Sequence, residues 1–286
     1  MDNIIRLSSR SEYQAYVEQN QALQLYKLRV IDLLTQGVRG TKRLPGFSVT
    51  ADRLVDFTID TNLVLPDGSY NLRETVNCPE TGFNMRMRAA IHAITDCENS
   101  AAGPVYLCEQ KTPMFTYFNE YFTDLVGSEY LGESIALGAT DADGLRNEDA
   151  TQLTFEDNSF NQVISFEVLE HIPDFNAALQ ETHRVLRPGG RFYFTAPFNP
   201  HTQDHLIRAK IEDGELIHIL EPEMHGDPVT GEGILCFQHF GWEIVKDLNA
   251  AGFRSIEALL FDGAEYGYYT QDPIIVFRAI AGDKES

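Results

Sequence analysis

The amino-acid sequence predicts an α/β fold, with a doubly wound, mainly parallel sheet over residues 100–286. Two observations lead to this prediction. From Pro104 onward, short apolar segments typical of strands alternate with segments typical of helices, a pattern that places helices on the faces of a parallel sheet. Acidic and small residues follow several of these strands, and in such sheets ligands bind beyond the carboxyl ends of the strands.

The predicted elements of this sheet follow one another in a regular order. Strands are expected at 105–108, 124–128, 161–168, 190–198, 254–261 and 273–281, and helices at 113–122, 173–186 and 241–252. No helical pattern separates the last two strands, so we expect them to form an antiparallel pair at one edge. Residues 199–238 interrupt the alternation, which indicates an insertion.

Residues 1–99 are predicted to form a helical and small β cap on the α/β domain, which we assign to residues 100–286. Apolar side chains at helical intervals predict one helix from about Ser9 to Gly37, and a second is expected from Asn84 to about Cys97. The residues between them have β character, interrupted by the turn-forming triplet Pro66-Asp67-Gly68.

The balance of charged residues is strongly acidic. The sequence has 43 Asp and Glu against 22 Lys and Arg, a formal net charge of −21. Proteins that bind nucleic acids or anionic membranes need a basic surface, so neither partner is expected. The four cysteines show no paired spacing, which favours a reducing compartment. Residues 1–16 lack the apolar core of a signal peptide, and no run reaches membrane-spanning length. We therefore expect a cytoplasmic protein.

The loop after the first strand of the sheet contains no glycine, although it stands where a glycine-rich turn is common. It reads Glu109-Gln110-Lys111-Thr112-Pro113. Thr112 is a good N-cap and Pro113 suits the first position of a helix, and a helix N-terminus attracts anions. Glu129 follows the second strand 20 residues after Glu109. At this spacing, dinucleotide-binding folds place the acid that accepts ribose hydroxyls.

Two further strand ends carry acidic residues, Glu148-Asp149-Ala150 and Glu167-Val168-Leu169-Glu170-His171. The stretch DATQLTFEDNSFNQVISFEVLEHIPDFNAALQETHRVLRPGGRFYFTAPF resembles the second half of the class I S-adenosylmethionine-dependent methyltransferase fold, type 11, and a weaker similarity is continuous over residues 105–281. The resemblance implies S-adenosylmethionine as cofactor. Glu129 would then hold its ribose, Asp149 and Ala150 its adenine edge, and Glu167 would also belong to the cofactor site.

The first loop departs from this family, which usually has Gly-x-Gly-x-Gly there. The combination EQKTP…GSEYLG is similar to a bacterial subset of methyltransferase-like proteins with the same substitution. This implies an altered cofactor site rather than a lost one. The helix end at Thr112 would receive the methionine carboxylate, and either Glu109 or Gln110 would bind the cofactor's amino group.

The acceptor side of the site is expected near two histidines. His171 follows the fourth strand end, where the acceptor and the methyl group should meet, although packing and capping of the next helix are equally good roles for it. The insertion contributes His225 and Asp227 as candidate bases, with a simple turn at Asp227-Pro228 as the alternative. His201 and His205 have the spacing of a helical metal pair. No cysteine or carboxylate completes a set, so the sequence predicts no metal site.

Two segments of the N-terminal region resemble the knuckles of a zinc ribbon that is attached to some of these relatives. They are PGFSVTADRLVDF and NCPETGFNMRMRAA. Only Cys78 remains as a ligand, with Thr81, Ser48 and Ala51 at the other positions, and a ribbon without thiolates cannot bind structural zinc. We expect a metal-free remnant held by apolar packing. Arg86 and Arg88, in the second segment, would either face an anionic acceptor or form a solvated helix face.

The sequence therefore favours methyl transfer from S-adenosylmethionine to a small-molecule or glycan-type acceptor. The alternative is a methyltransferase-like binding or scaffold protein that has lost turnover, which the missing glycines support. A nicotinamide-dependent dehydrogenase is a weaker hypothesis, because the first loop offers nothing that could lie under a pyrophosphate. The oligomeric state is left open.

Overall fold

The computed structural model describes residues 4–37, 39–62, 70–96, 103–226, 231 and 233–283. The chain divides into two compact units. Unit 1 comprises Met1–Leu7, Ser11–Ser100 and Ala258–Val276, and unit 2 comprises Ser8–Arg10, Ala101–Glu257 and Phe277–Ser286. Two strands, β15 (Phe253–Phe261) and β16 (Ile274–Ala281), contribute residues to both units.

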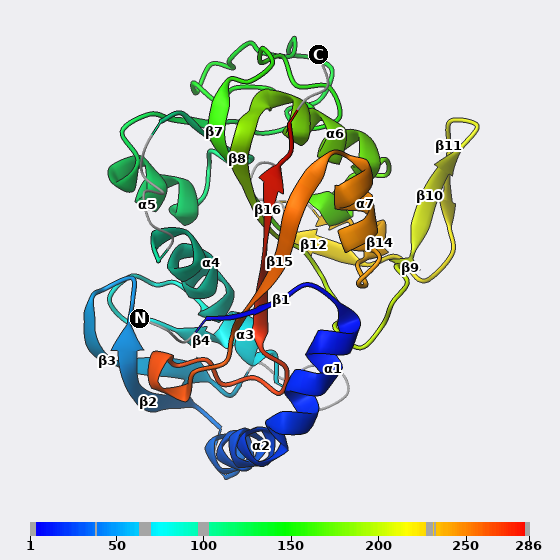
Figure 1. Cartoon of the computed structure of the whole chain (residues 1–286). Coiled ribbons are helices and arrows are strands. Elements are labelled where there is room, and N and C mark those ends of the chain that lie inside the picture. Colours follow the sequence, from blue (N-terminus) through cyan, green and yellow to red (C-terminus); the bar gives the residue numbers. More distant parts are fainter. Residues whose placement is uncertain are drawn as a thin grey trace. The chain divides into compact units, whose positions relative to one another are not determined.

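The main sheet has seven strands in the order β1-β15-β16-β8-β7-β5-β6 (Figure 1). Besides β15 and β16, this sheet contains β1 (Ile5–Leu7), β5 (Val105–Leu107), β6 (Leu125–Gly127), β7 (Phe160–Phe166) and β8 (Leu186–Thr195). Neighbours among β6, β5, β7 and β8 are parallel, and β16 is antiparallel to β8. The predicted α/β fold with a doubly wound, mainly parallel sheet is confirmed.

Two details of the sheet differ from the sequence prediction. The last two strands, β15 and β16, are neighbours but do not form the edge, because β1 pairs antiparallel with β15 beyond them. Before the strand end expected at Glu148-Asp149-Ala150, the described residues form one isolated parallel bridge, between Glu129 and Asn147, in place of a regular strand. Asn147 replaces the missing strand pairing with its side chain, which accepts from Leu131 N and donates to two backbone carbonyls of the same loop.

The helices of unit 2 lie where apolar periodicity predicts them: α5 (Pro113–Tyr121), α6 (Phe175–Val185) and α7 (Ile244–Ala250). Two of them begin at side-chain caps. Thr112 Oγ1 accepts from Phe115 N at 3.1 Å, and Asp174 Oδ1 accepts from Ala177 N at 3.1 Å. Each cap satisfies an amide that has no partner within the first turn of its helix.

Unit 1 contains two N-terminal helices where the sequence predicted one: α1 (Arg10–Gln19), which begins in unit 2, and α2 (Gln21–Thr35). They are separated at Asn20, whose side chain and backbone amide both donate to Tyr16 O. The hairpin of β2 (Thr41–Ser48) and β3 (Arg53–Asp60), the short elements α3 (Leu72–Thr75) and β4 (Val76–Asn77), and helix α4 (Met85–Thr95) follow. The turn predicted at residues 66–68 lies outside the described residues.

Charged side chains are buried inside unit 1. Lys27 forms an ion pair with Asp262, which also accepts from the Tyr16 hydroxyl. Arg88 is fully buried, donates to the carbonyls of Val76, Phe83 and Gly267, and lies 4.0 Å from the centroid of the Phe57 ring. Arg88 therefore neither faces an anionic acceptor nor lies on a solvated helix face, and both expectations for it are wrong. Its guanidinium instead donates to three backbone carbonyls in the core of unit 1.

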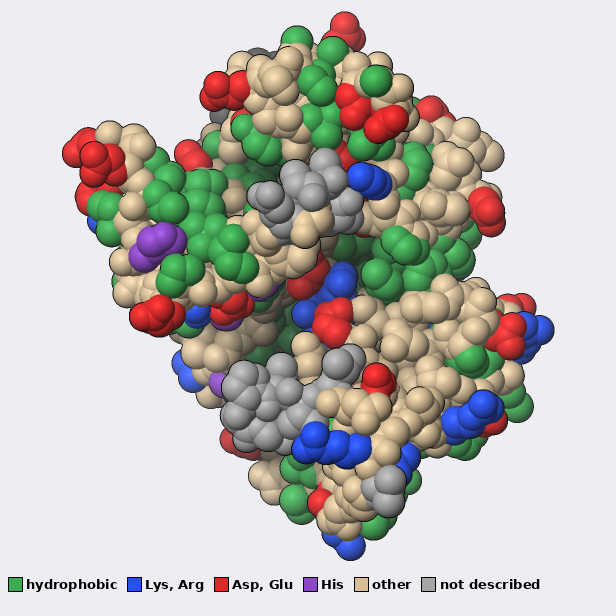
Figure 2. Space-filling model, turned by 180° about the vertical axis from the view of Figure 1, so that it is seen from behind, with side chains coloured by type: hydrophobic (Ala, Val, Ile, Leu, Met, Phe, Trp, Pro, Cys, Tyr) green, Lys and Arg blue, Asp and Glu red, His purple; other side chains and the backbone are tan. Residues whose placement is uncertain are grey.

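The insertion folds into short antiparallel strands: β9 (Leu206–Ile207), β10 (Ala209–Glu212), β11 (Glu215–His218), β12 (Met224–Gly226), β13 (Gly233–Leu235) and β14 (Gln238–His239). Its pairs are β10 with β11, β12 with β13, and β14 with β9. Large apolar side chains are exposed along it, among them Leu206, Ile211, Leu216 and Met224. Apolar atoms gather correspondingly at the left of Figure 2, mixed with acidic groups.

No helix among the described residues is long and apolar enough to cross a membrane.

Candidate functional site

The glycine-free loop after β5 is held by the carboxylate at the end of β6. Glu129 Oε1 accepts from the backbone amides of Gln110 and Lys111, at 2.7 and 2.8 Å. The two strand ends also approach closely at Gly127, where an added Cβ would lie 2.8 Å from Glu109 O. Glu129 and Gly127 thus fix the path of a loop that lacks glycines of its own.

The side chain of Gln110 is committed to the loop that follows β6. Its Oε1 accepts from Arg146 N at 2.8 Å, and its Nε2 donates to Gly144 O at 3.1 Å. Thr112 caps α5 as the sequence predicts, and the cap uses the amide of Phe115. Pro113 has no backbone N–H, so Met114 contributes the first amide of this helix.

Asp149 and Ala150 lie in a turn directly after the Glu129–Asn147 bridge. Asp149 Oδ1 accepts from the backbone amide and the hydroxyl of Thr151, at 2.8 and 2.7 Å, which shapes the turn. The preceding Glu148 is buried and accepts from Arg146 and Thr154. The strand ends that carry Glu109, Glu129 and Asp149 are therefore linked through neighbouring contacts.

The end of β7 has an unusual backbone. Glu167 adopts a φ of 54°, in the left-handed region that residues other than glycine rarely occupy. Its amide donates to Thr195 O at 2.9 Å, and the chain then turns into the 3₁₀ segment Leu169–His171. Backbone strain of this kind is concentrated at functional sites. The turn places Glu170 and His171 side by side beyond the strand.

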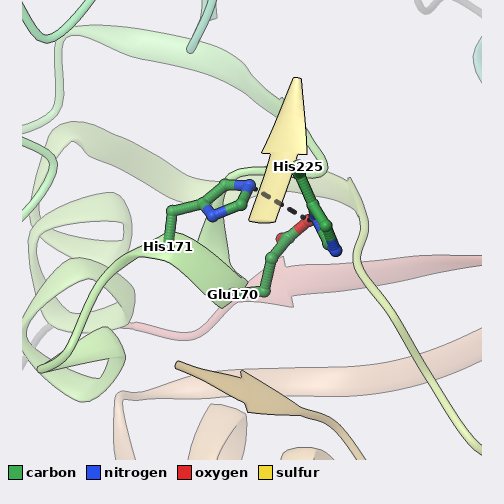
Figure 3. Close-up of side chains that lie close together, drawn as sticks. All are labelled: Glu170, His171 and His225. Atoms are coloured by element: carbon green, nitrogen blue, oxygen red, sulfur yellow. Dashed lines mark ion pairs between the residues drawn. The ribbon is translucent and has the colours of Figure 1, made fainter. Parts of the chain in front are cut away.

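Glu170, His171 and His225 converge at this point (Figure 3). Glu170 is fully buried. Its Oε1 lies 3.6 Å from His171 Nε2 and 3.6 Å from His225 Nδ1, and the two imidazole rings are nearly perpendicular, with centroids 5.0 Å apart. His225 comes from β12, so the insertion brings together the two histidines that the sequence singled out.

Each of these histidines is oriented through its other ring nitrogen. His171 Nδ1 donates to Leu235 O at 2.8 Å, and His225 Nε2 donates to Glu223 Oε1 at 3.0 Å. Glu223 Oε1 also accepts from His239 Nε2 at 2.9 Å. Burial raises the pKa of Glu223, but the hydrogen bonds from the two histidines outweigh it and lower that pKa.

The electrostatics of the cluster couple Glu170 to His225. Burial raises the pKa of the Glu170 carboxyl, and the charge of Glu167 adds to this effect, while His225 opposes it. The neighbouring Glu170 carboxylate in turn raises the pKa of His225 to about 9, against the effect of burial. Sequence reasoning missed the roles of Glu170 and Glu223. The adjacent pair Glu170-His171 was visible, but its partners come from a segment more than 50 residues further along the chain.

The other histidines of the insertion do not form the helical pair that their spacing suggested. His201 lies in a turn and is exposed. His205 Nε2 lies 2.8 Å from Asp247 Oδ2, and its Nδ1 accepts from Gly241 N. Both ring nitrogens are therefore engaged in hydrogen bonds within the protein. Asp227, the other candidate base, lies outside the described residues.

Three positions of the ribbon-like segments do meet in unit 1. Ser48 Oγ donates to Cys78 Sγ at 3.3 Å, and Thr50 links Ser48 to Thr81 through hydroxyl contacts of 3.1 and 3.2 Å. Burial raises the pKa of Cys78, but hydrogen bonds from Ser48 and Thr81 outweigh it and lower that pKa. A hydroxyl and thiol network thus stands where a ribbon would hold its ion.

Comparison with known proteins gives a match to the methyltransferase domain family over residues 112–194. The sterol 24-C-methyltransferase of Aspergillus fumigatus is 31% identical over 109 residues, which are 36% of this chain and 27% of that protein. The demethylmenaquinone methyltransferase of Staphylococcus epidermidis is 52% identical over 42 residues, or 15% of this chain and 17% of that protein. The chain thus spans less than a third of the length of these curated relatives.

Among solved structures, an S-adenosylmethionine-dependent methyltransferase from Mesorhizobium loti aligns with 66% of this chain and 95% of its own, at 17% identity and a TM-score of 0.42. The resemblance that the motifs from Asp149 to Phe198 indicated is confirmed by the family match, which begins at the cap of α5 and ends in β8. Residues 112–194 of this chain are therefore similar to the methyltransferase domain family.

Proposed function

We propose that this protein transfers a methyl group from S-adenosylmethionine to a small-molecule or glycan-type acceptor, and that it does so in the cytoplasm. One observation carries the proposal. Acidic residues follow successive strands of the sheet and are linked to one another around the capped N-terminus of α5, within or next to the segment that matches the methyltransferase domain family. Ligands of parallel sheets bind at this edge.

The donor set of these residues fits the cofactor. S-adenosylmethionine presents an ammonium, ribose hydroxyls and an adenine amine, all of which donate to carboxylates, and one carboxylate that suits a helix N-terminus. In this assignment Glu109 faces the ammonium, and the α5 terminus at Thr112 receives the carboxylate. Glu129 holds the ribose, and Asp149 with Ala150 lies at the adenine edge.

Gln110 and Glu167 take supporting positions in this assignment. The side chain of Gln110 already bonds residues 144–146, so its contribution is to hold the loop in place. Glu167 ends β7 in a strained conformation and borders the acceptor side.

The cofactor, when bound, supplies a methyl group already activated by a sulfonium. The chain's part is to position an acceptor atom in line with it, to exclude water and to receive one proton. His171 and His225 lie at the end of β7 and are the residues we assign to the acceptor. One nitrogen of each ring donates to Leu235 O or Glu223, and the other lies 3.6 Å from Glu170, so both rings are held in a fixed orientation at the acceptor side.

The loop geometry also favours a second candidate, a methyltransferase-like protein without turnover. Glu129 Oε1 is engaged by the amides of Gln110 and Lys111, so this carboxylate has a structural task that would persist without any cofactor. In that case Glu129 would stabilise the loop only, and S-adenosylhomocysteine would not bind.

Thermal unfolding with S-adenosylhomocysteine separates the two candidates. A ligand that binds only the folded state adds about 2.7 kcal/mol of stability at one hundred times its Kd, so a methyltransferase should show a clear rise in Tm. An unchanged Tm at millimolar ligand, together with no heat of binding in calorimetry, would contradict the proposed function. Transfer of labelled methyl groups into fractionated small-molecule and glycan extracts would then identify the acceptor class.

A further inference from the structure

We propose that Glu170, His171 and His225 form a binding site for a divalent transition-metal ion of the zinc, cobalt or manganese type. The sequence predicted no metal, because no cysteine or carboxylate completed a ligand set with the histidines of the insertion. The fold supplies that carboxylate from the end of β7. This inference depends on the geometry of the cluster and not on methyl transfer.

The separations in the cluster suit ligands around one ion. Both histidine nitrogens lie 3.6 Å from Glu170 Oε1, and the three ligand atoms all lie within 4.8 Å of one another. Two ligands of a tetrahedral ion at 2.0–2.2 Å are about 3.4 Å apart. A distance of 3.6 Å is too long for a hydrogen bond but close to that edge length, so a small inward movement of the side chains would complete the site.

The ring orientations are those of metal-binding histidines. Such residues donate their second ring N–H to a carbonyl or carboxylate, which fixes the tautomer and turns the other nitrogen toward the ion. His171 donates to Leu235 O, and His225 donates to Glu223. The nitrogen that remains on each ring is the one that faces Glu170.

The buried carboxylate is a second, independent indication. Glu170 is fully buried, and neither of its oxygens has a hydrogen-bond partner among the residues that the structure describes. A buried charge without hydrogen bonds is costly. A divalent cation would compensate it directly, and the charge of the nearby Glu167 would favour the same ion.

The neighbouring cluster of Glu223, Cys236 and His239 is a poorer candidate. Glu223 Oε1 already accepts from two histidines. Cys236 Sγ donates to Gln238 O at 3.5 Å, so its thiol also has a partner within the protein. We therefore propose that this cluster binds no ion itself and that its Glu223 orients His225 through their hydrogen bond.

Three protein ligands leave coordination positions open, as in catalytic rather than structural zinc sites. The site also requires two distant segments, because Glu170 and His171 follow β7 and His225 belongs to β12. Backbone contacts hold the segments together: Phe237 N donates to Glu170 O at 2.7 Å, and the Gln238 side chain donates to Leu169 O. The insertion thus acts as the second half of the site.

Titration of the chelator-treated full-length protein with Co²⁺, followed by its visible ligand-field bands, and with Zn²⁺ by calorimetry tests the proposal. We expect one equivalent per chain. Glu170→Gln keeps the shape of the side chain and should weaken binding more than hundredfold, as should His225→Asn. Glu223→Gln should weaken it about 10- to 100-fold, the usual effect of an outer-shell change. His218→Ala, an exposed histidine of β11, serves as the matched control and should bind as the unmodified protein does.

Three results would overturn the proposal: no binding of either ion at millimolar concentration, equal affinity in Glu170→Gln and the unmodified protein, or loss of binding in Cys236→Ala with retention in Glu170→Gln. Circular dichroism of each variant reports its folding. If Glu170→Gln fails to fold, His225→Asn gives the same test, because its side chain is only partly buried.

Discussion

Replacement of Glu129 separates the two tasks that the structure assigns to this carboxylate. In Glu129→Ala, the amides of Gln110 and Lys111 lose an acceptor at 2.7 and 2.8 Å. Hydrogen bonds to a charged group contribute about 1.5–3 kcal/mol, and the Lys111 contact is exposed, so we expect a loss of roughly 1.5–3 kcal/mol in the ligand-free protein. Loss of the ribose contacts should weaken S-adenosylhomocysteine binding at least about tenfold, or about 1.4 kcal/mol.

Glu129→Gln distinguishes these effects because its amide oxygen can still accept from both loop amides. The ligand-free protein should then lose less stability than Glu129→Ala does, whereas cofactor affinity should fall by a similar factor because the charge is gone. Chemical unfolding and calorimetry measure the two quantities, with the exposed Glu133→Gln as control. Unchanged affinity for S-adenosylhomocysteine in Glu129→Ala would refute the ribose role and leave Glu129 as a loop anchor only.

Three further predictions follow from the described contacts. Glu109→Ala should weaken S-adenosylhomocysteine binding. Gln110→Gly should lower the Tm without improving the affinity for this ligand, because the two hydrogen bonds of the Gln110 side chain disappear. Tighter binding of the ligand by Gln110→Gly would contradict this prediction. Burial lowers the pKa of Lys27 to about 8, below the 10.5 of an unfolded chain, although the charge of Asp272 opposes the shift. Between these values the unfolded chain binds more protons, so the free energy of unfolding should rise with pH by up to about 1.4 kcal/mol per unit, and Lys27→Met should remove that contribution; equal pH slopes would argue against it. Cys78→Ser should leave the metal content of the purified protein unchanged, and a loss of metal would move the ion to the ribbon-like segments.

The order of the elements in the sheet could be predicted because each one has a local pattern. Short apolar runs mark β5, β7 and β8, and caps such as Thr112 mark the start of a helix. The break at Asn20 and the isolated bridge at Asn147 were not predicted. The Asn147 side chain donates to two backbone carbonyls of its own loop, and the Asn20 side chain adds a hydrogen bond to Tyr16 O beside that of its own amide. Apolar periodicity does not predict such side-chain contacts.

The candidate site could be predicted only in part, for a related reason. Residues directly after a strand, such as Glu129 and His171, can be placed at the sheet's edge from their position alone. The partners of Glu170 could not, since His225 and Glu223 arrive from an insertion with no regular pattern. Arg88 was misjudged because its three carbonyl partners come from different parts of unit 1.

Unit 1 is built from separate segments of the chain, which limits how the protein can be divided into fragments for expression. A single cut near residue 100 would remove Ala258–Val276 from unit 1, and with it Asp262, the counter-ion of Lys27, and Gly267, a carbonyl partner of Arg88. Two buried cations would then lose part of their compensation. An N-terminal fragment should therefore be insoluble when expressed alone, and a soluble version would need residues 258–276 grafted back by a linker.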